Sequence, residues 1–254
     1  MRINFHVHSS YSYDGFNSIR AIYETSRSCG LDAIALTDHD CFEGVSAMHQ
    51  WLNKNNRSDL QVIPAEEVTC LDGTHIIGLF ITALIDRGAP IDVCKEIKLQ
   101  GGFVYFPHPA RHDGILASAD CTEALKLGDF YECFNAKIDD SFNKAAIAEL
   151  REKLLPLGGS DAHYNIDIKK CYCELEPAGS LRDTLVSYQR HHNIEIYGKR
   201  KFGATNYFPT YYKYKKYLPL PQFVRDLGKR LVPWIKNRQD RGKSVSLEKV
   251  YPAQ

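Results

Sequence analysis

Short runs of β-branched and aromatic residues alternate with helical stretches through most of the chain, and this alternation constrains the fold most. The expected strands cover residues 3–7, 33–37, 61–65, 76–81, 103–106, 130–134, 156–158 and 171–175. The expected helices cover residues 18–28, 42–53, 91–100, 122–126, 141–153 and 181–190. Strands that alternate with helices favour a parallel sheet with helical crossovers. The pattern therefore predicts an α/β fold, either a barrel or a doubly wound sheet.

One connection breaks this alternation. Only seven residues separate Glu67 from His75, and they include the turn pair Asp72-Gly73. A parallel crossover needs a dozen or more residues, whereas an antiparallel pair needs only a tight turn. This connection therefore predicts a β-hairpin inside an otherwise parallel sheet.

Charge divides the chain into two parts. Residues 196–254 hold 14 Lys and Arg against 3 Asp and Glu, whereas residues 1–195 hold 18 against 28. Residues 207–217 are aromatic and basic, and the apolar residues in 220–231 follow a helical spacing. We predict one domain over 1–195 and a basic, Tyr-rich extension over 196–254 with helical and extended structure.

The extension leaves several partners open. It can pack on the acidic body or on a sister subunit, giving an oligomer, or it can bind nucleic acid through lysines and stacked rings. An anionic membrane surface is a further alternative. We expect no transmembrane segment, because no apolar run approaches the ~18 residues that a span needs. The start of the chain lacks a signal peptide, and its eight scattered cysteines form no CxxC pair, so we expect a cytoplasmic protein with reduced thiols.

Histidines and carboxylates gather where the expected strands end. His6 and His8 close the first strand, and residues i and i+2 of a strand point to the same face, so both can reach one ion. Asp14 follows in the loop after the same strand, and His75 opens the return strand of the hairpin. The others lie at the ends of later strands: His39, Glu67, His108, Asp161 and His163. Because α/β barrels place their active sites at the carboxyl ends of strands, this pattern predicts a multinuclear metal centre. Nitrogen and oxygen donors without cysteine favour manganese, zinc or iron.

The order of these motifs resembles the PHP (polymerase and histidinol phosphatase) family of metal-dependent phosphoesterases. In sequence order they are HxH, SxDG, TDHD, ExT, a hairpin histidine, HPxR and SDxH, and the resemblance covers about residues 1–195. It implies a distorted TIM-like (β/α)7 barrel that binds two or three divalent ions. Ala65 is a departure, since many members have glycine at that position.

The resemblance also implies how the ligands divide. His6, His8, Glu67 and Asp161 would hold a first ion, and Glu67 would bridge to a second ion held by His75 and His108. A third ion would bind Asp14, His39 and His163. Glu67 is preferred to Glu66 because the family's glutamate precedes an aliphatic residue and then Ser or Thr, as in Glu67-Val68-Thr69.

The expected reaction is hydrolysis of a small phosphomonoester or nucleotide phosphate by a metal-bridging hydroxide. We assign Asp161, Glu67 and Asp38 to catalysis, with Asp38 either orienting a ligand or capping the following helix. Arg111 is expected to bind phosphate through two parallel hydrogen bonds, and Asn135 is a second substrate contact. Cys133 could act as a thiol nucleophile, but its place within a strand disfavours this.

Three other functions remain open from the sequence. An exonuclease-like phosphodiesterase acting on single-stranded nucleic acid would use the basic extension. A catalytically weak metal-binding module would keep the ligands without turnover. Hydrolysis at carbon is the third, because related barrels with similar metal sites cleave amides.

Overall fold

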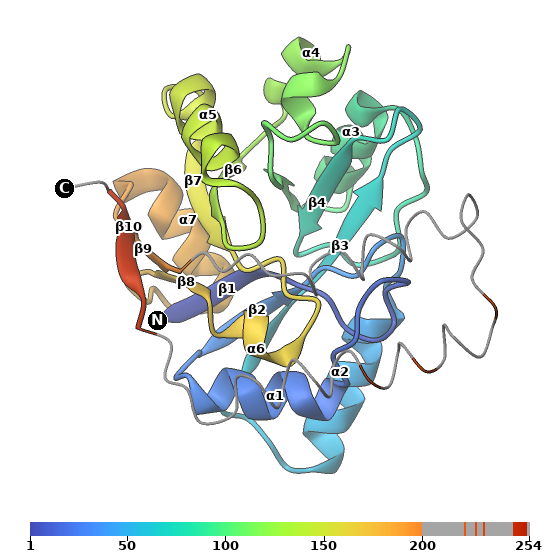
Figure 1. Ribbon diagram of the computed structural model, residues 1–254, viewed down its shortest axis with the longest axis vertical. Helices are drawn as coiled ribbons and strands as arrows, with labels where there is room; N and C mark the ends of the chain where they lie inside the picture. Colours follow the sequence, from blue (N-terminus) through green and yellow to red (C-terminus); the bar gives the residue numbers. More distant parts are fainter. Residues whose placement is uncertain (200–220, 222–226, 228–230, 232–245, 253–254) are drawn as a thin grey trace.

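The computed structural model describes residues 1–199, 221, 227, 231 and 246–252 (Figure 1). Ten strands in this described part form one sheet. They are β1 (Arg2–Val7), β2 (Ala33–Leu36), β3 (Gln61–Thr69), β4 (His75–Leu79), β5 (Phe103–Phe106), β6 (Phe130–Asn135), β7 (Leu155–Gly159), β8 (Cys171–Glu174), β9 (Glu195–Gly198) and β10 (Glu248–Tyr251).

The strand order is β10-β9-β8-β1-β2-β3-β4-β5-β6-β7, and the sheet curls so that β7 returns to β1. A parallel bridge joins Val7 to Ala162, and the His8 amide donates to the Ala162 carbonyl at 3.0 Å. Seven strands thus enclose an irregular barrel, and β8, β9 and β10 extend the sheet beyond β1. The predicted distorted TIM-like barrel is confirmed.

Strand direction follows the connections between the strands. The β1–β2, β2–β3, β5–β6 and β6–β7 pairs are parallel, as helical crossovers require. The β3 and β4 strands form the predicted hairpin, with Thr69 opposite His75. His75 therefore begins its strand at the end of the barrel where the parallel strands finish.

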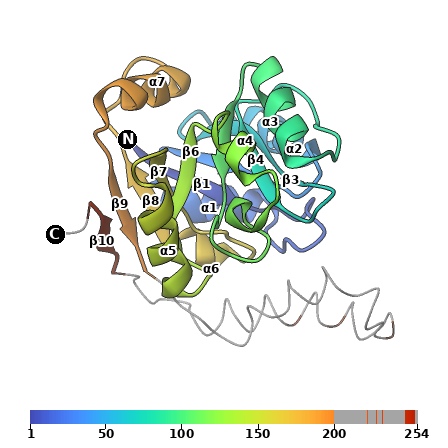
Figure 2. The same cartoon turned by 90° about the horizontal axis from the view of Figure 1, so that it is seen from above.

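Helices surround the barrel (Figures 1 and 2). They are α1 (Ile19–Ser28), α2 (Glu43–Lys54), α3 (Pro90–Leu99), α4 (Cys121–Leu125), α5 (Asp140–Leu150), α6 (Asn165–Ile168) and α7 (Leu181–His191), with a short 3-10 helix at Ile115–Ala117. Ser180 and Asp183 form a capping box that starts α7, each side chain accepting from the other's backbone. Its buried residues Leu181, Leu185 and Tyr188 follow the helical period and pack onto the core.

Strand alternation separates the barrel interior from the helical layer. In β2, Ala33 and Ala35 belong to the main core, whereas Ile34 and Leu36 belong to a second core formed with α1 and α2. Small alanines on the inner side leave room for the polar side chains of the neighbouring strand ends. Packing of β2 against a core on each side thus holds the strand in place, together with the segment after it that carries His39.

Several elements differ from the sequence-based expectation. The α6 helix, the 3-10 helix, β9 and β10 were not predicted. The β9 strand, Glu195–Gly198, runs across the predicted boundary near residue 196, and β10 pairs with it. The division into domains stays a prediction, and the helix expected over 220–232 lies almost wholly outside the described residues. Among the described residues, no helix is long and apolar enough to cross a membrane; the cytoplasmic location stays a prediction.

Candidate metal centre

The nine predicted ligands converge at one end of the barrel, and all are buried. None exceeds the 7% exposure of His39. They come from β1, β3, β4 and the segments that follow β1, β2, β5 and β7: His6, His8, Asp14, His39, Glu67, His75, His108, Asp161 and His163. Convergence from so many separate strands gives several donors to each point, which a multinuclear site requires.

A first group surrounds one oxygen of Glu67. The Nε2 atoms of His6 and His8 lie 3.1 Å apart and are 3.0 and 3.2 Å from Glu67 Oε2. Asp161 Oδ1 is 3.4 Å from His8 Nε2 and 3.8 Å from His6 Nε2. Two ligands about 2.05 Å from a tetrahedral ion are about 3.3 Å apart. The printed distances from His6 and His8 to each other and to the two carboxylates are therefore close to the spacing of ligands around a single ion.

The other oxygen of Glu67 faces two further histidines. Glu67 Oε1 is 2.9 Å from His75 Nδ1 and 3.1 Å from His108 Nε2. Since its two oxygens point to different histidine pairs, the Glu67 carboxylate has the geometry of a bridge between two ions. Glu66 points the other way and accepts from the Ile85 amide at 2.9 Å.

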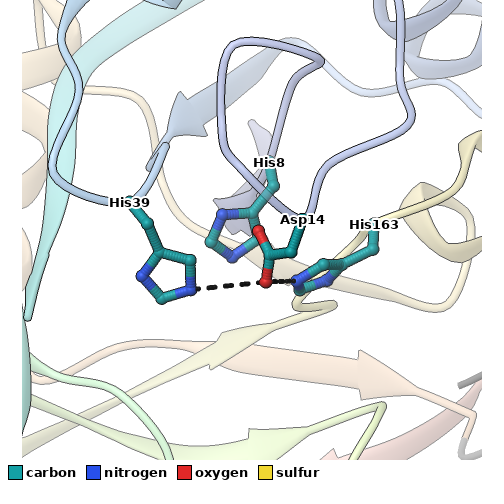
Figure 3. A group of neighbouring side chains, drawn as sticks. All are labelled: His8, Asp14, His39 and His163. Atoms are coloured by element: carbon teal, nitrogen blue, oxygen red, sulfur yellow. Dashed lines mark hydrogen bonds and ion pairs between the residues drawn. The ribbon is translucent and has the colours of Figure 1, made fainter. Parts of the chain in front are cut away.

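Asp14 organises a third group (Figure 3). Its Oδ2 lies 2.8 Å from His163 Nε2 and 3.7 Å from His39 Nε2. His8 belongs to the same set of mutually close donors and also to the set with His6 and Asp161. His39 likewise joins a set with Glu67 and His75. Because His8 and His39 are shared, the division of ligands among two or three ions stays a prediction.

A lysine ammonium marks the same place as a cation site. Lys137 Nζ lies 3.3 Å from Asp161 Oδ1 and 3.1 and 3.2 Å from the two ring nitrogens of His163. A positive charge thus already lies among these donors. With the all-nitrogen and oxygen donor set, this fits a divalent ion of the zinc, manganese or iron type.

Mutual charges decide the protonation of the centre. Burial raises the pKa of Glu67, but His39, His6 and His75 outweigh it and hold that pKa well below its ordinary value. Asp161 behaves in the same way, with Lys137 as the strongest opposing charge. Burial lowers the pKa of His108 to about 4, and Arg111 adds to this. Ionised carboxylates and neutral imidazoles, as at His108, are the forms that bind metal. Although burial lowers the pKa of His8, its hydrogen bonds to Asp161 and Glu67 raise that pKa to about 9, so an ion that binds there would displace a proton.

Two of the ligands occupy unusual backbone conformations. His108 has φ of 31° and Asp161 has φ of 48°, in a region that non-glycine residues seldom adopt. Each lies two residues beyond the last residue of its strand, β5 for His108 and β7 for Asp161. Such strain is typical of functional sites, because the surrounding packing must enforce it.

Glu132 contacts two of the predicted ligands, and the sequence analysis assigned it no role in the site. It lies fully buried, 3.0 Å from His6 Nδ1, and accepts from the His108 amide at 2.7 Å. This contact fixes which nitrogen of His6 faces the ions. The signal available in the sequence was a lone glutamate inside an apolar strand.

Two predicted residues have other surroundings than expected. Asn135 is fully buried and donates to Glu132 at 2.8 Å and to Asp161 at 3.3 Å, so it holds two side chains of the cluster in place, and its role as a substrate contact stays a prediction. Asp38 accepts from the amide and hydroxyl of Ser9 at 2.5 and 2.6 Å. It holds the loop that leaves β1, and the helix-cap interpretation is wrong because Phe42 is the N-cap residue of α2 and no side chain caps this helix.

A cavity of about 110 Å³ opens onto the ligands. Arg111 lines it and donates two hydrogen bonds to Asp113, whose Oδ2 is 2.8 Å from Arg111 Nη2. Phosphate binding by Arg111 stays a prediction. Lys137 lines the cavity from the loop after β6 and was not predicted. All eight cysteines are free thiols, and Cys133 is buried away from this lining.

Several known proteins are similar to this chain in sequence or in fold. An uncharacterized protein of Methanocaldococcus jannaschii is 29% identical over 120 residues, covering 43% of this chain and 68% of that protein. A protein of Bifidobacterium adolescentis has been assigned as a metal-dependent phosphoesterase. Its crystal structure has a TM-score of 0.53 to this chain at 15% sequence identity, and the match covers 72% of this chain and 95% of that protein. The lesion-specific endonuclease PfuEndoQ of Pyrococcus furiosus has a TM-score of 0.59 to this chain at 15% sequence identity, and the match covers 77% of this chain and 58% of that protein.

The structural likenesses establish a shared fold, and a family model goes further. The model of the PHP domain matches residues 4–152, more than half of the chain. The matched span includes seven of the nine converging side chains, and Asp161 and His163 lie just beyond it. The chain therefore belongs to the PHP domain family.

Proposed function

We propose that this protein is a metal-dependent phosphoesterase that hydrolyses a small phosphomonoester or a nucleotide phosphate. The observation that carries the proposal is the Glu67 carboxylate, whose two oxygens face His6 and His8 on one side and His75 and His108 on the other. Divalent ions bound there would lower the pKa of a coordinated water and neutralise charge on the phosphoryl oxygens.

The residues of the chain orient the predicted metal ligands and shape the cavity that would receive the phosphoryl group. Glu67 and Asp161 stay ionised at neutral pH and keep the neighbouring imidazoles oriented. The cavity of about 110 Å³ is below the ~300 Å³ of a typical ligand pocket, so it suits a phosphoryl group whose organic part lies outside. The relative named as a phosphoesterase favours the same chemistry.

Phosphate release by metal-loaded protein tests the proposal. The panel contains p-nitrophenyl phosphate, nucleoside mono- and bisphosphates, sugar phosphates, an amide substrate and a short oligonucleotide, with manganese and zinc assayed separately. Asp161→Asn is the inactive control. Turnover of a phosphate ester that the control loses supports the proposal, and turnover of the amide alone would overturn it.

Phosphodiester cleavage in nucleic acid is the second candidate. It is favoured by the fold shared with PfuEndoQ, a lesion-specific endonuclease, and by the 14 Lys and Arg of residues 196–254. A binding constant for the oligonucleotide that falls steeply with salt would favour it. Oligonucleotides with and without a terminal phosphate separate removal of the phosphate from cleavage of the strand.

A further inference from the structure

Lys137 is a cation of the cavity that neither the predicted ligand set nor the family motifs account for. We propose that Lys137 binds the phosphate group of the substrate and favours terminal phosphomonoesters over diesters. The inference rests on the proposed phosphoesterase function and names the substrate class of the same site.

The position of Lys137 places its ammonium beside the reaction centre. It lies in the loop between β6 and α5, its side chain is 20% exposed, and it lines the cavity. Its Nζ contacts Asp161 Oδ1 at 3.3 Å and the ring nitrogens of His163 at 3.1 and 3.2 Å. The ammonium is therefore within a few ångströms of two predicted metal ligands while still open to solvent.

These contacts are ones that bound ions would take over. Asp161 and His163 would use the same lone pairs to coordinate a divalent ion, and two cations cannot share them at close range. The lysine stem is flexible and its ammonium carries three rotatable donors. Lys137 can thus turn into the cavity, where the phosphate of a substrate would replace Asp161 as its anionic partner.

The second permanent cation of the cavity is already paired. Arg111 donates to both oxygens of Asp113. Burial raises the pKa of Asp113, but His108 and Arg111 outweigh it and hold that pKa well below its ordinary value. Arg111 also lies 3.4 Å from His108 Nε2, at the opposite end of the ligand cluster from His163. Its charge is largely neutralised in place, so Lys137 is the cation whose charge is available to an incoming anion.

Charge on the substrate gives the selectivity. A terminal phosphate carries up to two negative charges on three unsubstituted oxygens, whereas a diester carries one charge on two. The attraction to an ammonium scales with the charge of the anion. Removal of Lys137 should therefore weaken binding of a monoester more than binding of a diester.

The test compares Lys137→Met and Lys137→Arg with the control Lys144→Met. Lys144 is on α5, its side chain is 78% exposed, and it pairs with Asp140 at 2.8 Å. Three quantities are measured for each metal-loaded variant. They are the bound metal per chain, the dissociation constant of inorganic phosphate, and kcat and KM for p-nitrophenyl phosphate and bis-p-nitrophenyl phosphate.

We expect Lys137→Met to keep its metal and to bind phosphate about 10- to 100-fold more weakly, the range for loss of a charged hydrogen bond. KM for the monoester should rise more than KM for the diester, Lys137→Arg should recover part of the loss, and Lys144→Met should match the wild type. Unchanged phosphate affinity, equal losses for both esters, or loss of metal would each overturn the inference. If the wild type hydrolyses no phosphate ester of the panel described above, the proposed function fails, while the phosphate affinities still test Lys137.

Discussion

Two neighbouring glycines of β7 face two buried regions, one whose acidic groups are neutral and one whose acidic groups are ionised. A side chain at Gly159 would lie 2.1 Å from Glu132 Oε1, on the side of the metal centre, whereas one at Gly158 would meet Cys171 Sγ at 3.0 Å. Both regions contain deeply buried ionisable groups. We refer to Cys133, Cys171 and Cys173 as the core thiols.

Burial, together with the nearby Glu132 carboxylate, keeps the core thiols neutral. It raises the pKa of Cys173 to about 12 and the pKa of Cys133 well above its ordinary value, with no cation among the causes to oppose it. Burial acts in the same direction on Glu67 and Asp161, yet their pKa values fall well below the ordinary range. The difference shows that a buried acid stays ionised only when cationic partners surround it, and such ionised ligands are what metal binding needs.

Replacing Glu67 with glutamine should have the largest effect. The change removes the charge that both histidine pairs face, so bound metal should decrease and kcat/KM for a phosphate ester should fall more than about 100-fold, beyond the range for a supporting residue. Metal content and kinetics of the purified variant measure this.

Glu66→Gln is the matched control for Glu67→Gln. Glu66 is equally buried on the same strand, but its carboxyl contacts the Ile85 amide and burial raises its pKa to about 8. The control should keep its metal. Equal metal loss in the two variants would show that burial of an acid in β3, and not the bridging position, holds the ions.

Glu132→Gln should have an intermediate effect. Glu132 contacts the His6 ring and the His108 amide, and removing the charge of such a partner weakens metal binding about 10- to 100-fold. A competition titration against a chelator measures the metal affinity. Glu174→Gln, at a half-exposed position on β8, serves as the control, and identical affinities for the two variants would contradict a supporting role.

The convergence of the predicted ligands could be anticipated from the sequence because several of them obey local rules. His6 and His8 share a face by the two-residue period of a strand, and the short link to His75 predicts a hairpin that returns to the same end. The division of ligands among ions came from the resemblance and not from these rules. The contacts of the supporting residues could not be predicted in the same way.

Irregular backbone explains what the sequence could not reveal. The β6–β7 register shifts between Glu132 and Phe134, and this brings Asn135 to the side of Glu132, although simple alternation places residues i and i+3 on opposite faces. Lys137 reaches Asp161 from a loop whose path no periodicity specifies. The pairing of β10 with β9 joins segments about 50 residues apart, and such a long-range contact is not specified by any local sequence pattern.

The smallest expected effect concerns the core thiols and has a defined pH dependence. Because the folded-state pKa of Cys173 is raised from 9.0 to about 12, its stabilising contribution is complete below about pH 9 and is lost as the pH rises toward 12. At pH 10 the unfolded thiol is mostly ionised, which lowers the free energy of unfolding by about 1.4 kcal/mol relative to pH 8. Cys173→Ala cannot titrate, so its free energy of unfolding should fall about 1.4 kcal/mol less between these pH values in urea titrations. The packing lost with the sulfur is the same at both pH values and cancels, so an equal decline in variant and wild type would mean that this thiol is not held neutral by burial.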